Sequence, residues 1–90
     1  MNIVYSKPSC PYCVKAKALL KKHDIQFEEK ILGSDITPNE LFEVFDAKEL
    51  PRPRTAPQIF LGGTYVGGYD QLVTYMEETG YNGTGHAIGT

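Results

Sequence analysis

Cys10 and Cys13 are the two cysteines of this 90-residue chain, and two residues separate them in a C-x-x-C pattern. A thiol attacks a disulfide only as the thiolate, and an ordinary cysteine with a pKa of about 8.5 is mostly protonated at neutral pH. Two neighbouring thiols can together reduce a disulfide, because one forms a mixed disulfide with the substrate and the other resolves it. The spacing therefore predicts thiol–disulfide chemistry, provided that one cysteine is activated.

The residues around Cys10 favour its activation. Pro11 is typical of the first position of a helix, so Cys10 is expected where unpaired N–H groups and the positive end of the helix dipole meet. Lys7 adds a positive charge three residues upstream. We therefore expect Cys10 to be the low-pKa nucleophile. Cys13 lies one turn further along the same side of the helix, where it would be less exposed and would resolve the mixed disulfide.

Two other interpretations of the C-x-x-C pair, a zinc site and a structural disulfide, have less support. A structural zinc site needs four ligands, and the histidines that remain are His23, in a predicted helix, and His86, near the C-terminus. We therefore expect no metal. An inert structural disulfide is typical of oxidising compartments. The first residues lack the basic and apolar segments of a signal peptide, which makes a reducing, cytoplasmic location the expectation.

Length and composition exclude several classes of protein. Ninety residues predict a single domain, and a formal net charge of −2 argues against a nucleic-acid-binding protein. No apolar run approaches the roughly 20 residues that cross a bilayer, so we expect no membrane partner.

Hydrophobic spacing predicts the element order β-α-β-α-β-β-α. The expected elements are a strand at 2–6, a helix from 11 to 23, a strand at 25–31, a helix that begins at 38 after the cap Thr37, strands at 58–61 and 64–66 joined by Gly62-Gly63, and a helix at 69–78. This order predicts an α/β, thioredoxin-like fold: a four-stranded mixed sheet flanked by three helices. Residues 1–79 would form the domain, and the glycine-rich residues 80–90 a flexible tail.

Three segments, in this order, resemble the glutaredoxin family. Residues 7–13, Lys-Pro-Ser-Cys-Pro-Tyr-Cys, are similar to the active site of its dithiol members, which carry Cys-Pro-Tyr-Cys. Residues 55–60 resemble its Thr-Val-Pro segment, and residues 67–70 its Gly-Gly-x-Asp segment. The resemblance spans about residues 1–79. The chain has no tryptophan and lacks the Trp-Cys-Gly-Pro-Cys of typical thioredoxins.

The resemblance implies a glutathione site beside the catalytic Cys10 and Cys13. Lys7 and Arg54 would meet the glycyl carboxylate, and Arg52 is a second candidate for that contact. A cis Pro57 would hold the backbone of Ala56 open for the tripeptide to pair with. Asp70 would hold the γ-glutamyl end and is also a candidate cap of the last helix. The full set of glutathione-binding residues implied is Lys7, Tyr12, Arg54, Thr55, Ala56, Pro57, Gly68, Tyr69 and Asp70.

The family implies an oxidoreductase that uses glutathione to reduce protein disulfides and glutathione mixed disulfides. Its partners would be glutathione and disulfide-bonded or glutathionylated proteins, with ribonucleotide reductase a candidate by analogy, and the chain would be a monomer. Two alternatives remain open: a homodimer that carries an iron–sulfur cluster through Cys10 and two glutathiones, and a non-catalytic redox sensor. Cluster carriers of the family usually lack the proline after the first cysteine, so Pro11 disfavours the carrier.

Overall fold

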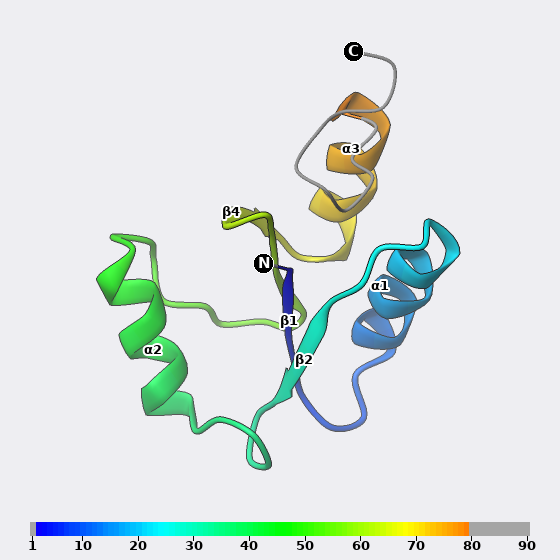
Figure 1. The fold of residues 1–90 in the computed structure, drawn as a ribbon. Coiled ribbons are helices and arrows are strands. Elements are labelled where there is room, and N and C mark those ends of the chain that lie inside the picture. Colours follow the sequence, from blue (N-terminus) through cyan, green and yellow to red (C-terminus); the bar gives the residue numbers. More distant parts are fainter. Residues whose placement is uncertain (1, 80–90) are drawn as a thin grey trace.

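A computed structural model describes residues 2–79 of the chain (Figure 1). The elements follow the predicted order: β1 (Ile3–Ser6), α1 (Pro11–Lys22), β2 (Glu28–Ile31), α2 (Pro38–Ala47), β3 (Gln58–Leu61), β4 (Thr64–Gly67) and α3 (Tyr69–Thr79). The α/β fold is therefore confirmed. The predicted tail at 80–90 lies outside the described residues.

The four strands form one mixed sheet in the order β2-β1-β3-β4. β1 and β2 are parallel, with Ile3 opposite Glu28, whereas β3 pairs antiparallel with both β1 and β4. The parallel pair and the antiparallel hairpin are both as predicted. Gly62 and Gly63 form the hairpin turn with φ values of 59° and 84°, and these positive values suit glycine.

The second strand is shorter than its sequence pattern predicts. Residues 25–27 alternate apolar and polar side chains as a strand would, yet β2 begins only at Glu28. The backbone N–H of Ile25 donates to the carbonyl of Leu20, so it closes the end of α1 instead of joining the sheet. Asp24, with φ of 56°, makes the reversal, and the Ile25 side chain is buried in the core. The alternation reflects this burial and not strand pairing.

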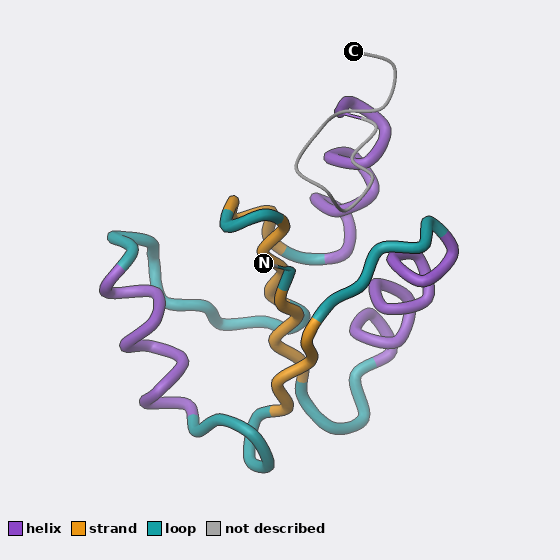
Figure 2. The backbone as a smooth tube through the Cα atoms, viewed as in Figure 1, coloured by secondary structure: helices purple, strands orange, loops and turns teal. Residues whose placement is uncertain are grey.

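Helices cover both faces of the sheet, with α2 on one side and α1 and α3 on the other (Figures 1 and 2). Because side chains alternate along a strand, each central strand supplies both cores. Val4 and Ile59 face the core shared with α1 and α3, while Tyr5 and Phe60 face the core shared with α2. Gln58, the polar first residue of β3, is two residues before Phe60 and therefore lies on the same face of the sheet, the α2 face.

The predicted residues form the start of α2 and the end of α1. The hydroxyl of Thr37 accepts the backbone N–H of Glu40, and the Glu40 carboxylate accepts the backbone N–H of Thr37, which completes a capping box at the start of α2. Basic Lys21 and Lys22 occupy the last turn of α1, where the helix dipole favours them. Within residues 2–79, no helix has the length and apolar character needed to span a membrane.

Candidate active site

Cys10 and Cys13 are joined as a disulfide at the start of α1, directly after the loop that leaves β1. Their Cα atoms lie 5.2 Å apart. Ser9, with φ of 56°, turns the chain from the strand into the helix. The exposed fraction is 6% for Cys10 and 2% for Cys13, so Cys13 is the less accessible of the two, as the sequence predicted.

Cys10 caps helix α1 with its sulfur. Its backbone is extended, with φ of −110° and ψ of 103°, and the backbone N–H of Cys13 donates to the Cys10 sulfur over 3.2 Å. A donor at a helix N-terminus stabilises an anion there, because the N–H group has no partner within the helix and the dipole favours negative charge. The same donor would therefore stabilise a thiolate on Cys10 after reduction.

The loop before β3 faces the disulfide. The Ala56–Pro57 peptide bond is cis, as the resemblance implied. The Cys10 sulfur lies 3.6 Å from the carbonyl oxygen of Ala56. A disulfide sulfur carries no proton, so this distance is a contact in the oxidised protein. A reduced Cys10 thiol in the same place could donate to that oxygen.

Two shallow grooves run along this loop and meet at Thr55 and Ala56, which line both. One, of about 150 Å³, is apolar at its base and carries Lys7 and Arg54. The other, of about 180 Å³, runs toward the start of α3. All nine predicted glutathione-binding residues line one or both grooves: Lys7, Arg54, Thr55 and Ala56 in the first, and Tyr12, Thr55, Ala56, Pro57, Gly68, Tyr69 and Asp70 in the second.

The cations of the first groove are not engaged elsewhere. Within residues 2–79, neither Lys7 nor Arg54 forms a hydrogen bond or ion pair, and both side chains are exposed. Arg52, the second candidate for a carboxylate, is instead held by Asp46 through hydrogen bonds of 3.2 and 2.8 Å. Its guanidinium also lies 5.2 Å from the centre of the Phe42 ring. Arg52 is thus paired outside the lining of the first groove, and its competition with Arg54 stays a prediction.

The start of α3 is capped by Gly68 and Gln71, not by Asp70. The carbonyl of Gly68 accepts the first helical hydrogen bond, from Leu72, and the backbone N–H of Gly68 donates to the Gln71 side chain over 3.0 Å. Asp70 is one position inside the helix and is exposed. The spacing Gly68-x-x-Gln71 is that of a capping box, and this signal could have identified the cap from the sequence. Asp70 does not form the cap, and it lines the second groove.

Tyr12 lies across the second groove. The residue is 56% exposed, and its ring centre is 6.1 Å from that of Tyr69. The ammonium of Lys15 lies 5.3 Å from the centre of the same ring. A large apolar ring that stays exposed beside Cys10 offers a contact surface for a ligand.

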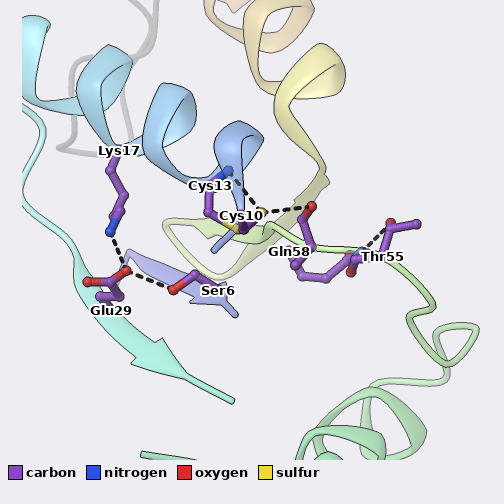
Figure 3. Close-up of a disulfide and its surroundings, with 8 residues drawn as sticks. Ser6, Cys10, Cys13, Lys17, Glu29, Thr55 and Gln58 are labelled. Atoms are coloured by element: carbon purple, nitrogen blue, oxygen red, sulfur yellow. Dashed lines mark hydrogen bonds and ion pairs between the residues drawn. A yellow bond between two sulfur atoms is a disulfide. The ribbon is translucent and has the colours of Figure 1, made fainter. Parts of the chain in front are cut away.

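A third groove, of about 610 Å³, is lined by both cysteines and contains a charged cluster that the sequence did not predict. There the Glu29 carboxylate accepts hydrogen bonds from Lys17 at 2.6 Å and from Ser6 at 2.7 Å (Figure 3). The hydrogen bond from Lys17, followed by that from Ser6, holds the pKa of Glu29 below its ordinary value. Such a cluster joins three separate elements and has no local sequence signal.

A disulfide-bonded cysteine pair at the N-terminus of α1, next to a cis-proline loop in a fold with a four-stranded mixed sheet, defines the class of thioredoxin-fold dithiol proteins. Among residues 2–79, no three His, Cys, Asp or Glu side chains gather as a metal site would require.

Comparison with known proteins narrows this class. The glutaredoxin family model matches residues 2–66. Glutaredoxin 1 of Rickettsia prowazekii is 42% identical over 76 residues, which are 84% of this chain and 77% of that protein. The hybrid peroxiredoxin hyPrx5 of Haemophilus influenzae is 40% identical over 73 residues, 81% of this chain, but the chain spans only 28% of its length. The crystal structure of a buckwheat glutaredoxin–glutathione complex has the same fold, with a TM-score of 0.70 and 23% identity over 86% of this chain and 68% of that one.

The chain therefore belongs to the glutaredoxin family. Family membership and the Cys10–Cys13 pair together make it a thiol–disulfide oxidoreductase.

Proposed function

We propose that the protein reduces glutathione mixed disulfides and protein disulfides with glutathione as the electron donor, through Cys10 as nucleophile and Cys13 as resolving cysteine. One observation carries the proposal: a groove lined by the cations Lys7 and Arg54 and a groove lined by the carboxylate Asp70 meet at Ala56, which contacts the Cys10 sulfur.

The grooves suit the charges of glutathione. Glutathione is an extended tripeptide with a carboxylate at its glycyl end and both a carboxylate and an ammonium at its γ-glutamyl end. Lys7 and Arg54 would bind the glycyl carboxylate, and arginine can do so with two parallel hydrogen bonds. At the other end, the N-terminus of α3 would bind the γ-glutamyl carboxylate and Asp70 its ammonium. The cysteinyl sulfur would then lie near Cys10. The buckwheat complex shows that a protein of this fold binds glutathione.

The reaction on a glutathionylated protein needs two exchanges. The Cys10 thiolate attacks the glutathione sulfur, so a Cys10–glutathione disulfide forms, the old disulfide breaks, and the protein thiolate leaves with the electron pair. The thiolate of a second glutathione then attacks the glutathione sulfur on Cys10. This step releases glutathione disulfide and restores the Cys10 thiolate.

A protein disulfide uses both cysteines. Cys10 forms a mixed disulfide with the client, and the Cys13 thiolate attacks the Cys10 sulfur, which releases the reduced client and leaves the Cys10–Cys13 disulfide. Two glutathiones then reduce that disulfide, and glutathione disulfide is again the product.

The test compares wild type with Cys10→Ser and Cys13→Ser in two assays driven by glutathione: reduction of a small glutathione mixed disulfide and reduction of a protein disulfide. We expect Cys10→Ser to abolish both activities. Cys13→Ser should retain a substantial part of the first and lose most of the second, because only the second needs a resolving thiol.

An inactive wild type would refute the proposal, and so would full activity of Cys10→Ser. If inactive wild type purified without oxygen absorbs visible light as an iron–sulfur protein does, cluster carriage becomes the account of the site.

A further inference from the structure

Gln58 is a buried polar side chain at the start of an otherwise apolar strand. It directly follows Pro57, its exposed fraction is 4%, and the rest of β3 is Ile59, Phe60 and Leu61. Its side-chain nitrogen donates to the backbone carbonyl of Thr55 over 2.9 Å, and its side-chain oxygen accepts the hydroxyl of Tyr65 over 2.6 Å. The chain Tyr65–Gln58–Thr55 thus links β4 to the loop that faces Cys10.

Chemistry fixes the direction of both hydrogen bonds. A backbone carbonyl only accepts, so the amide nitrogen of Gln58 must face Thr55. The amide oxygen then faces Tyr65, whose hydroxyl must donate. Burial raises the pKa of Tyr65, so the hydroxyl keeps its proton at neutral pH. Removing either partner would leave a buried amide group unpaired.

The ring of Tyr65 packs against aromatic side chains of the core on the α2 face. Its ring centre is 5.5 Å from that of Phe45 and 5.2 Å from that of Phe60. In contrast, the backbone of residues 51–56 has little support of its own, although the Arg52 side chain is paired with Asp46. Within residues 2–79, the backbone of residues 51–56 accepts one hydrogen bond, the one from the Gln58 side chain to the Thr55 carbonyl. The other polar contact of this backbone is that between the Ala56 carbonyl and the Cys10 sulfur.

We propose that Gln58 and Tyr65 are positioning residues: through these two hydrogen bonds they hold the Thr55–Ala56 backbone in place beside Cys10 and so keep open the edge on which glutathione binds. The glutathione part of this inference rests on the proposed function. Neither side chain lines the two grooves, and their effect on the ligand is therefore indirect.

The variant Tyr65→Phe deletes the first hydrogen bond and keeps the ring in the aromatic core. We expect the KM for a glutathione mixed disulfide to rise about threefold to tenfold, the effect of one neutral hydrogen bond, with kcat within about twofold of wild type. Gln58→Met should raise KM at least as much. The double variant should be no worse than Gln58→Met alone, because both changes break one linked network.

Tyr5→Phe is the matched control. Tyr5 also packs on Phe60, with ring centres 6.0 Å apart, but makes no hydrogen bond to the loop. Its loss of a hydroxyl should leave KM unchanged. If Tyr5→Phe and Tyr65→Phe raise KM equally, the effect is one of general stability and the proposal is wrong.

A second readout does not need glutathione to be the ligand. NMR order parameters of the Thr55 and Ala56 amides should fall in Tyr65→Phe and stay at wild-type values in Tyr5→Phe. Unchanged order parameters in Tyr65→Phe would overturn the positioning role even if the wild type uses glutathione. Lower order parameters with an inactive wild type would instead leave the positioning role standing and refute the proposed function.

Discussion

The hydrogen bonds of the Glu29 carboxylate predict how the stability of the fold changes with pH. Oxygen Oε2 accepts from both Lys17, at 2.6 Å, and Ser6, at 2.7 Å, and the Glu29 side chain is 27% exposed. These bonds tie β2 to α1 and to β1, the two elements that flank Cys10. Replacing Glu29 with glutamine removes the charge but keeps the shape of the side chain.

A hydrogen bond to a charged group contributes about 1.5–3 kcal/mol when buried. Because this carboxylate is partly exposed and must also lose water, we expect Glu29→Gln to lower the free energy of unfolding by about 1–2 kcal/mol at pH 7. The pKa of Glu29 is lower in the folded chain than its ordinary value of 4.5. The stabilisation is therefore complete above the pKa of the unfolded chain, and it is lost as the pH falls through the folded pKa.

Urea unfolding of wild type and Glu29→Gln from pH 7 down to pH 3 measures this difference. The difference in the free energy of unfolding should shrink steadily below about pH 5. Glu43→Gln is the control, because Glu43 is exposed and forms no hydrogen bond or ion pair within residues 2–79. A difference at pH 7 below about 0.3 kcal/mol, or one that is the same at pH 3 as at pH 7, would refute the reasoning.

Two further predictions concern the grooves and the second helix. Lys7→Gln and Arg54→Gln should each raise the KM for a glutathionylated substrate about threefold to tenfold at low salt, and the effect should diminish as salt screens the charges. Lys22→Gln, at the far end of α1, is the control, and an unchanged KM in both groove variants would show that these cations do not bind the ligand. Thr37→Ala should lower the free energy of unfolding in urea by about 1 kcal/mol, because it removes one half of the capping box. The exposed Asn39→Ala, in the same turn, should cost less, and equal losses would contradict the capping argument.

Local sequence signals predicted those parts of the molecule that depend on neighbouring residues. Pro11 placed the start of α1 and hence Cys10 at its N-terminus, and Thr37 and Glu40 placed the start of α2. The Gly62-Gly63 turn fixed the hairpin. In each case a backbone preference or a hydrogen bond across one turn decides the structure, so the residues involved are adjacent in the sequence.

Features that depend on distant residues were missed or misplaced. Ser6 and Glu29 are 23 residues apart and meet only because β1 and β2 pair in parallel. Ile25 was predicted to lie in a strand because it is apolar. An apolar side chain is equally suited to burial at the end of a helix, which is where Ile25 lies. Gln58, in turn, gave no sequence signal because its partners come from a loop and from the next strand.

Arg52 and Arg54, in the loop of residues 51–56 that precedes β3, show what the structure adds to the resemblance. Arg52 and Arg54 have the same charge and are two residues apart, so their charge and spacing do not rank them, whereas the resemblance favours Arg54. The structure pairs Arg52 with Asp46, which lowers the pKa of that carboxyl, and stacks its guanidinium on Phe42. An arginine neutralised in this way adds little field at a neighbouring groove. Lys7 and Arg54 line that groove from two different loops, and they are the cations that the proposed function assigns to a ligand carboxylate.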